Sequence, residues 1–278
     1  MNKKILVGAD PELFIKKGNE IISAETFIEG TKENPFDIGK GCAIQLDNVA
    51  CEFNIPPASS FEEFEKSINF PLDFIIDKLK REGLSICTDK SSHSFDKKYL
   101  RTENAKKFGC DPDFDVYRAT TNLSPSSVGN FRTVAGHIHV GFGEIAEVSI
   151  ENAEKVVKAF DLFVTVPSIL TDLDRERRKL YGKAGSFRYK PEYGVEIRTL
   201  SNFWIFDKDY MKKVYDGTIL ATELALRRDL EEILLENEED IKKAINSYDE
   251  DIAKELIADV ITPFYEEKEQ LASIKKII

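Results

Sequence analysis

Polar and charged residues recur two positions apart in several short segments of this sequence, with mostly apolar residues between them. The pairs are Asp10 and Glu12, Glu52 and Asn54, His137 and His139, Ser186 and Arg188, and Glu196 and Arg198. Side chains two apart on a β-strand point to the same face of a sheet, and the residues between them point to the other face. The pattern therefore predicts a sheet whose apolar face packs on helices and whose polar face gathers carboxylates, imidazoles and guanidinium groups.

The order of the expected elements favours an α+β fold with a largely antiparallel sheet, because no regular alternation of strands and helices is found. Residues 25–41 and 89–130 are predicted as loops, and a loop as long as the second is usually functional. Strands are expected at 4–16, 20–24, 84–88 and 131–142, in two runs around a turn at Asp47-Asn48 within 43–55, and in a hairpin of 185–190 and 194–200.

Three helical regions are expected. The pattern Ser60-Phe61-Glu62-Glu63 is a capping box that begins a helix to about residue 82, which Pro71 kinks or splits. A long helix should run from about 150 to 180, with Ser149 or Asn152 near its cap. From residue 207 the chain should be helical to its end, with breaks near 246–247 and Pro263. We expect one domain over 1–278, with the sheet in about 1–205 and a helical part in about 206–278.

Composition narrows the class of protein. Hydrophobic residues make up 42% and charged residues 32% of the 278 residues, which is typical of a globular chain. The net charge of −11 argues against a partner nucleic acid. No apolar run approaches the roughly 18 residues of a membrane helix, and the first residues resemble a strand more than a signal peptide, so we expect a cytoplasmic protein without a membrane partner. Without a C-x-x-C spacing, the cysteines are expected to be reduced and buried: Cys42, Cys51, Cys87 and Cys110.

The paired residues predict a divalent metal site. Each pair alone has an ordinary explanation: a solvated Asp-x-Glu, a cross-strand ion pair, or structural histidines. Together they offer oxygen-rich ligation with one histidine, which suits Mg²⁺ or Mn²⁺. His93 lies in a serine-rich loop and is a poor ligand candidate. The expected metal ligands are Asp10, Glu12, Glu52, His137 and Glu196.

Arginines beside such a site make an anionic ligand, such as a polyphosphate, natural. The sequence has no G-x-x-x-x-G-K-[ST] loop and no G-x-G-x-x-G pattern, so a nucleotide would be held by metals and arginines. It also has no G-x-S-x-G elbow, which disfavours a serine hydrolase.

The order of these motifs resembles the glutamine synthetase superfamily. Gly8-Ala9-Asp10-Pro11-Glu12 is similar to its E-P-E-F strand, Gly136-His137-Ile138-His139 to its His-x-His strand, and Ser186-Phe187-Arg188 with Glu196-Ile197-Arg198 to its Ser/Arg and Glu-x-Arg strands.

The resemblance is closer still to the phage-associated carboxylate–amine ligases, the amidoligase type 2 group similar to a phiEco32 phage protein. It covers roughly 5–205 and rests on four further stretches: Asp47 to Pro57, Gly109-Cys110-Asp111-Pro112-Asp113, Ala135 to His139, and Tyr181 to Arg188.

This resemblance implies a curved antiparallel sheet backed by helices, like the glutamine synthetase catalytic domain, and ATP-dependent joining of a carboxylate to an amine. It implies that the five expected ligands share two or more Mg²⁺ or Mn²⁺ ions. His139 and Ser186 would lie along the nucleotide phosphates, and Arg188 would stabilise the transferring phosphoryl group. Arg198 would hold the substrate carboxylate or the phosphoryl group, with Asn54 as a further substrate contact and Glu196 as a catalytic residue. A phage-encoded enzyme would act in the host cytoplasm.

The sequence departs from glutamine synthetase in two respects. It has no counterpart of the small N-terminal domain, and the acidic groups that bind ammonium there cannot be placed. The amine is accordingly expected to be larger than ammonia, such as an amino acid, a peptide or a cell-wall group, with supply by an amidotransferase partner as an open alternative. Asp111, Asp113 and Asp115 could shape the acceptor site or simply cap helices. The oligomeric state is not indicated by the sequence.

Three other functions compete with the ligase. One is a phosphotransferase with guanidino-kinase-like chemistry on the same sheet. Another is a non-catalytic protein that binds a nucleotide or a metal, although crowded carboxylates without a metal are costly. The third is a metal hydrolase that uses His137 and His139 and works without ATP.

Overall fold

The computed structural model describes residues 4–106, 113–122, 129–227 and 230–267. Its main sheet has nine strands in the order β10-β9-β13-β14-β12-β1-β6-β5-β4, and every neighbouring pair is antiparallel. The strands are β1 (Leu6–Leu13), β4 (Phe36–Gly39), β5 (Cys42–Asp47), β6 (Ala50–Asn54), β9 (Phe114–Asp115), β10 (Thr120–Thr121), β12 (Gly136–Gly141), β13 (Ser186–Lys190) and β14 (Gly194–Ile197).

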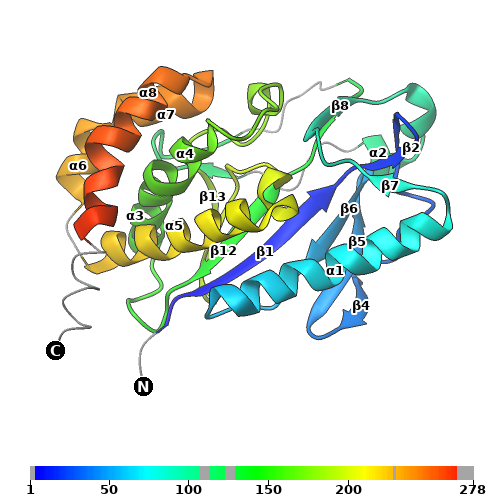
Figure 1. Ribbon diagram of the computed structural model, residues 1–278, viewed down its shortest axis with the longest axis horizontal. Coiled ribbons are helices and arrows are strands. Elements are labelled where there is room, and N and C mark those ends of the chain that lie inside the picture. The colour runs from blue at the N-terminus through cyan, green and yellow to red at the C-terminus, as the bar shows by residue number, and fades with distance from the viewer. Residues whose placement is uncertain (1–3, 107–112, 123–128, 228–229, 268–278) are drawn as a thin grey trace.

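Two small sheets lie beside the main one. The first has the order β3-β2-β7, and the second pairs β11 with β8. Their strands are β2 (Ile15–Lys17), β3 (Glu20–Ile22), β7 (Ser85–Ile86), β8 (Ser92–Ser94) and β11 (Phe131–Thr133). Both small sheets lie beyond the end of β1, at the right of Figure 1.

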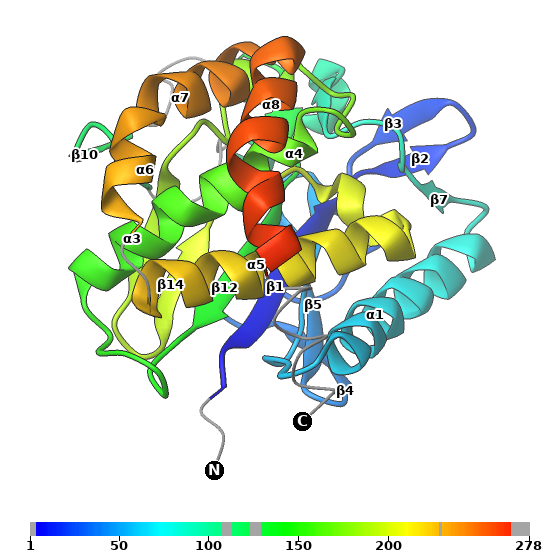
Figure 2. The ribbon, with the colours of Figure 1, turned by 60° about the vertical axis from the view of Figure 1, so that its left-hand side comes forward.

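Helices cover one side of the main sheet, where α1, α3 and α5 pack against its strands and against one another (Figures 1 and 2). The helices α6, α7 and α8 stack outside α3 and α4. The α-helices are α1 (Phe61–Arg81), α2 (Glu103–Lys106), α3 (Ile150–Phe160), α4 (Val166–Ser168), α5 (Lys208–Arg227), α6 (Glu231–Glu236), α7 (Glu238–Ser247) and α8 (Glu250–Leu256). Short 3₁₀ turns are η1 (Lys97–Tyr99), η3 (Arg177–Lys179) and η4 (Asn202–Phe206), and π-helical turns are η2 (Asp161–Thr165) and η5 (Ile257–Ile261).

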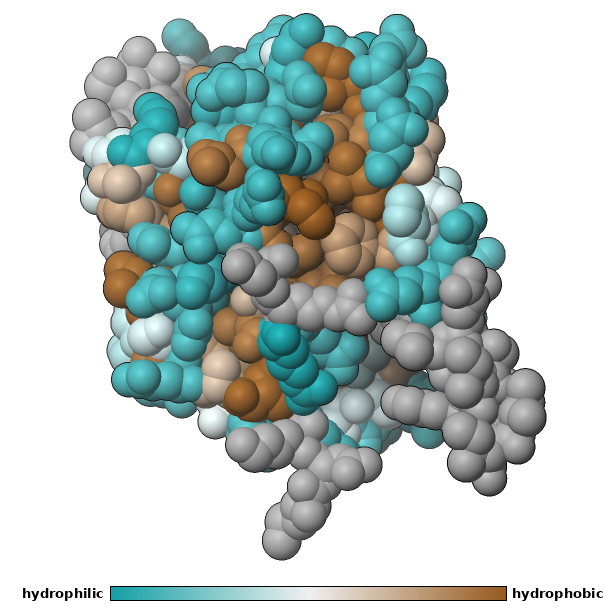
Figure 3. All heavy atoms as spheres, turned by 90° about the vertical axis from the view of Figure 1, so that its left-hand side faces the viewer, coloured by the Kyte–Doolittle hydropathy of each residue, from teal (hydrophilic) through white to brown (hydrophobic). Residues whose placement is uncertain are grey.

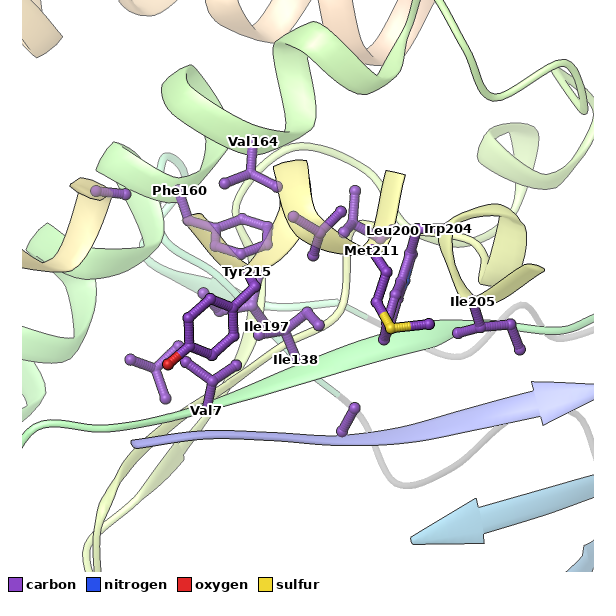
Figure 4. Packing of buried hydrophobic residues seen from close by; sticks show 14 of the residues in the cluster. Val7, Ile138, Phe160, Val164, Ile197, Leu200, Trp204, Ile205, Met211 and Tyr215 are labelled. Atoms are coloured by element: carbon purple, nitrogen blue, oxygen red, sulfur yellow. The ribbon is translucent and has the colours of Figure 1, made fainter. Parts of the chain in front are cut away.

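The core fills the space between this helical layer and the apolar face of the sheet. Val7, Ile138 and Ile197 project from β1, β12 and β14 toward the helices (Figure 4). Met211 and Tyr215 of α5 lie on the other side of this layer, so the apolar residues of these strands are buried between the sheet and the helices. Burial of such side chains stabilises the fold by roughly 1.5–3 kcal/mol each and fixes which face of the sheet remains for polar groups.

Local signals explain where α1 begins. The Ser60 side chain accepts a hydrogen bond from the Glu63 backbone N–H, as the capping pattern predicts. The Glu63 carboxylate returns to the backbone N–H of Ser59 at 2.9 Å, one residue before the cap. Pro71 does not split the helix, which runs unbroken from Phe61 to Arg81, so this part of the prediction is wrong.

Several other predicted boundaries differ from the structure. The expected strand 131–142 is two strands in different sheets, because the chain changes sheet at 134–135. The expected helix 150–180 is capped by Ser149 but gives way to a π-helical turn and ends at Ser168. The predicted loop 25–41 contains β4, and the predicted loop 89–130 contains short strands and turns in its described part. The chain is helical through Pro263, so the break expected there is absent, and the break expected near 246–247 lies at 248–249. The helical part is also interrupted at Leu230, before α6, and at Asn237, between α6 and α7.

A wide apolar hollow of about 620 Å³ opens among the helices, between α4, the first half of α5 and η5. Apolar side chains gather on the helical side of the molecule in Figure 3. None of the predicted site residues lines this hollow. Among the described residues, no helix is long and apolar enough to cross a membrane. Three cysteines, Cys42, Cys51 and Cys87, are buried and free, and Cys110 lies outside the described residues.

Candidate metal centre

The strand register places the predicted polar residues on one face of the main sheet. Asp10 lies opposite His137, His139 opposite Glu196, and Glu196 opposite Arg188. Glu12 lies opposite Glu52. Directly opposite residues in antiparallel strands point to the same face, so five strands contribute to one polar surface, on the side away from the helices.

A first group of potential metal ligands consists of Asp10, His137 and Glu196, each of which offers an atom within 4.8 Å of the others. Nδ1 of His137 is 3.2 Å from Oδ1 of Asp10 and 4.0 Å from Oε1 of Glu196. His139 does not belong to this group, but its Nε2 is 3.1 Å from the same Asp10 oxygen. Two carboxylates and one imidazole suit Mg²⁺ or Mn²⁺.

A second group, Glu12, Asp47 and Glu52, lies beside the first and meets the same distance limit. All three side chains are buried. The backbone N–H of Ala135 donates to Glu12 at 2.9 Å, whereas Oε2 of Glu52 is buried without a hydrogen-bond partner among the described residues. A buried carboxylate oxygen without a donor is costly unless a cation or a proton satisfies it.

The two groups differ in their protonation. Burial and the nearby Asp47 raise the pKa of Glu12 to about 8. Burial and the neighbouring Asp10 carboxylate raise the pKa of Glu52 well above its ordinary value. The second group therefore holds protons at neutral pH that a divalent cation would displace. Like-charged carboxylates at this distance, together with the orphaned oxygen, fit a divalent cation.

The first group carries a resting negative charge. Burial works against ionisation of Asp10, but the imidazoles of His139 and His137 outweigh it and hold the pKa of Asp10 well below its ordinary value. Burial and the Arg198 guanidinium lower the pKa of His137 to about 3, so its imidazole is neutral at physiological pH. Neutral imidazole is the form that ligates metals.

Three cations converge on Glu196. Lys190 lies 2.7 Å and Arg188 3.4 Å from its carboxylate, and Arg198 also forms an ion pair with it. Arg198 is 1% exposed and is further held by Asp113 and the Tyr181 hydroxyl, whereas Arg188 keeps 21% of its side chain exposed. Arg188 and Lys190 are therefore the cations that can reach a ligand above the sheet, and Arg198 is enclosed.

The other predicted residues lie at the edges of this surface. The Asn54 amide donates to Gln45 at 3.3 Å. Ser186 is buried, 3.5 Å from the Asn122 amide, which also donates to Asp113 at 2.8 Å. Of the acidic trio, Asp113 reaches the site through Arg198. Asp115 accepts from the backbone N–H groups of the turn that follows it, which is a structural role. Asp111 lies outside the described residues.

A narrow hollow of about 260 Å³ adjoins the first group on the polar face. Gly8 and Gly141 form its floor. They lie two residues from Asp10 on β1 and from His139 on β12, on the same face of the sheet, and having no side chains they leave the backbone uncovered. Apolar walls and one imidazole suit the flat ring of a ligand whose charged end lies over the metal ligands. The remaining walls are Leu6, Ala9, Asn54, Ile55, Pro57, His139 and Tyr193.

Sequence reasoning gave no site role to four residues that the structure places here, although Asp47 and Tyr181 lie in stretches that carry the resemblance. Asp47 was interpreted as a turn residue, although it ends β5 and belongs to the second group. Lys190 continues the two-residue spacing beyond Ser186 and Arg188, which was the available signal. Tyr181 and Tyr193 lie in turns and reach His137 and His139 through their hydroxyls at 3.0 Å and 2.5 Å, and no spacing on a strand could reveal them.

The fold and the site define an antiparallel-sheet protein with two adjoining groups of potential metal ligands and cations beside them. The chain belongs to the family of phage phiEco32-like COOH.NH2 ligases of type 2, whose model matches residues 119–276. That match includes His137, Arg188 and Glu196, and the strands that supply Asp10, Glu12, Asp47 and Glu52 precede it. No curated protein sequence matches the chain.

Three solved structures are similar at low identity. A novel glutamine synthase homolog is 10% identical, with a TM-score of 0.39 over 91% of this chain and 65% of that one. Ligand-free GmaS is 11% identical, with a TM-score of 0.40 over 98% and 70%. A bifunctional glutathione synthetase from Pasteurella multocida is 11% identical, with a TM-score of 0.42 over 94% and 49%. The chain spans about half to two thirds of these proteins, and no residue role is transferred from them.

Proposed function

We propose that this chain is an ATP-dependent carboxylate–amine ligase that forms an amide or peptide-like bond through an acyl phosphate. The observation that carries the proposal is the pair of adjoining ligand groups, Asp10-His137-Glu196 and Glu12-Asp47-Glu52, beside the exposed cations Arg188 and Lys190. Membership of a family of carboxylate–amine ligases supports it.

The proposed reaction has two steps. An oxygen of the substrate carboxylate attacks the γ-phosphorus of ATP, the bond to the β-phosphate oxygen breaks, and ADP leaves. The amine nitrogen then attacks the acyl carbon, phosphate leaves with the electron pair, and the amine proton passes to a base or to solvent. Activation is needed because oxide is a poor leaving group from a carboxylate.

The residues of the polar face have distinct proposed roles. The two ligand groups would hold divalent cations, which would supply positive charge to offset that of the phosphates. Arg188 would contact the transferring phosphoryl group, since it is the more exposed arginine. Arg198 would position Glu196 and Tyr181 through its ion pair and hydrogen bond with them. It would contact the substrate only after rearrangement of these buried partners. Ser186 and Asn54 would lie at the two borders of the bound substrates.

The glycine-floored hollow is the proposed site of the nucleotide base. It adjoins His139, so a base stacked there would direct its phosphates toward Lys190 and the first ligand group. The carboxylate and the amine would then bind at the opposite end of β13, where Asn122 and Asp113 border Ser186. Small molecules or peptides are the proposed substrates, in the cytoplasm, and supply of the amine by an amidotransferase partner remains part of the same proposal.

Hydroxylamine can replace the unknown amine in the test. Incubation with ATP, Mg²⁺ and pools of carboxylic acids should give hydroxamates, because hydroxylamine intercepts acyl phosphates. Positive pools name the carboxylate without knowledge of the amine. A kinase would instead make ADP and a phosphorylated nitrogen, and a hydrolase would act without ATP. ATP binding without hydroxamate from any acid would favour the non-catalytic alternative.

A further inference from the structure

Tyr181 has no role in the two proposed chemical steps, yet its hydroxyl lies against His137, at the imidazole nitrogen opposite to the one that faces Asp10 and Glu196. The hydroxyl oxygen is 3.0 Å from Nε2 of His137 and forms a hydrogen bond with Arg198. The phenol ring lies near two guanidinium groups, 5.1 Å from that of Arg177 and 5.4 Å from that of Arg198. The side chain therefore connects a potential metal ligand to an arginine of the site.

The surrounding structure holds Tyr181 in this position. The fully buried Arg177 donates to the carbonyls of Val134 at 3.0 Å and Thr199 at 2.9 Å, just before β12 and just after β14. Gly182 has a φ of +73°, and a Cβ there would lie 2.1 Å from the Arg177 guanidinium. Because the turn is packed this closely, the hydroxyl is fixed relative to the strand that carries His137.

The directions of the hydrogen bonds follow from the chemistry of each group. Nδ1 of His137 faces the Asp10 carboxylate at 3.2 Å, and because an ionised carboxylate only accepts, a hydrogen on Nδ1 would point toward it. Nε2 of the neutral imidazole then accepts the Tyr181 O–H, and Arg198, which has no acceptor, donates to the Tyr181 oxygen. His139 is turned the other way: its Nε2 lies 3.1 Å from the same Asp10 oxygen, and its Nδ1 lies 2.5 Å from the Tyr193 hydroxyl.

Ligation of a cation requires the other tautomer of His137. Nδ1 is the nitrogen that faces Asp10 and Glu196, so it must lose its hydrogen to become a ligand, and the proton must move to Nε2. A phenolic hydroxyl can donate or accept. We propose that Tyr181 is a positioning residue that keeps Nε2 of His137 hydrogen-bonded in both tautomers, donating when Nδ1 is bonded to Asp10 and accepting when Nδ1 binds a divalent cation. This inference rests on the metal site of the proposed function.

Nuclear magnetic resonance can observe the tautomers directly, because the chain has 3 histidines. The full chain would be labelled with ¹⁵N-histidine, and two-bond ¹H–¹⁵N spectra would be recorded with and without Mg²⁺ alone. A His93→Gln variant assigns the third signal. His137 should change from the Nδ1–H to the Nε2–H pattern on Mg²⁺ addition, while His139 keeps its Nε2–H pattern. Saturation with Mg²⁺ without a change at His137 would overturn the proposal.

Metal affinity provides the second readout. Tyr181→Phe should weaken binding of Mn²⁺ alone by about 10- to 100-fold in calorimetry, because the outer N–H of the ligand loses its acceptor. Tyr189→Phe is the matched control, since its hydroxyl donates to the Val148 carbonyl at 2.9 Å, away from the ligands. Circular dichroism melts check that both variants fold.

The outcomes separate this inference from the function on which it rests. Equal Mn²⁺ affinity in Tyr181→Phe and wild type would overturn the role of Tyr181 and leave the metal site intact. Wild-type protein that binds neither cation would remove the metal site from the proposed function, and the inference with it.

Discussion

At the scale of single residues, the site combines groups that differ in their resting charge. Asp10 is ionised and paired with two imidazoles, whereas Glu12 and Glu52 are buried carboxyls whose pKa values are raised. A cation entering the second group must displace protons, so metal binding should depend on pH there. The first group can bind without such an exchange, because the His137 proton needs only to move from one nitrogen to the other.

The first prediction concerns stability against pH. In a metal chelator, thermal stability should fall as pH rises from about 6.5 to about 8, because the folded protein retains a proton on Glu12, whose pKa is about 8, that the unfolded chain has released. His137 acts in the opposite direction only at the start of this window, because the unfolded imidazole, with a pKa of about 6.5, loses its remaining protons by about pH 7.5. The melting temperature gained with Mg²⁺ should grow over the same range.

Thermal melts in chelator and in Mg²⁺ across this range measure both trends. Glu12→Gln should flatten the decline in chelator. Asp161, whose pKa burial raises to about 7, contributes in the same direction, and Asp161→Asn measures that part separately. A metal-free melting temperature that rises steadily through this window would contradict the protonation assigned to the second group.

The second prediction concerns Arg188. Arg188→Ala should lower kcat by about 10²–10³ with little change in Mn²⁺ affinity, because a preorganised charge on the transferring group acts mainly in the transition state. Steady-state kinetics with the acid found by hydroxamate formation give the value. Arg175→Ala, at an exposed ion pair with Glu250, is the control and should retain activity. Loss confined to KM would show that Arg188 binds the ground state only.

The sequence predicts the residues that lie on strands better than those in turns. The two-residue spacing places Asp10, His137 and Glu196 on one face, and the register agrees. Asp47 was not predicted as a ligand because a turn explains an Asp-Asn pair equally well. Tyr181 and Tyr193 were not predicted as site residues because no residue spacing encodes their positions. The position of Tyr181 depends on the packing of a turn against Arg177, and that of Tyr193 depends on the closing of a hairpin.

At the scale of elements, the strands β1 and β12 and the hairpins β5–β6 and β13–β14 carry the site. The helices form the layer on the other face of the sheet, so changes in α1 should alter stability without altering the site. This separation follows from the alternation of the strands, which gives one set of side chains to each layer.

The third prediction tests this separation. Ser60→Ala removes the side-chain acceptor for the Glu63 N–H at the start of α1 and should destabilise the protein by about 1 kcal/mol. Ser67→Ala within the same helix should cost nothing, since alanine is the better helix former. Denaturant unfolding measures both, and Mn²⁺ affinity should be unchanged in both. Weaker Mn²⁺ binding in Ser60→Ala would show that α1 and the site are coupled.

The fourth prediction tests the hollow. Gly141→Val places methyl groups in the space between Leu6 and Tyr193, and should raise the KM for ATP while Mn²⁺ affinity stays constant. Nucleotide titration and Mn²⁺ calorimetry separate the two effects. Gly143→Ala, just beyond β12, serves as a control for substitution of a nearby glycine. An unchanged KM in Gly141→Val would place the base elsewhere.

Element boundaries were the least predictable part of the fold. The segment 131–142 resembles one strand in sequence. In the structure it forms β11, which pairs with β8, and then β12, which belongs to the main sheet. The helix expected to residue 180 ends early because Arg177 and Arg178 are buried in a turn that packs against the strand ends. Both departures come from tertiary contacts that local patterns do not contain.

At the scale of the whole molecule, the chain forms one polar surface from strands that are distant in sequence. Asp10 and Glu196 meet although 185 other residues separate them, because β12 lies between β1 and β14 in the sheet. A largely antiparallel sheet was predicted from the α+β pattern, and the fold confirms it, but the order of the strands was not predicted. The number of residues brought together on the surface is what distinguishes a built site from scattered surface charges.

The central claim is that this surface couples ATP to the joining of a carboxylate and an amine. The most direct measurement is phosphate release by the purified chain with ATP, Mg²⁺ or Mn²⁺, and pools of acids and amines, alongside Glu196→Ala and Arg188→Ala. The account predicts phosphate release that needs both an acid and an amine and that is lost in both variants. Failure of ATP even to bind in calorimetry, with the metal present, would contradict it.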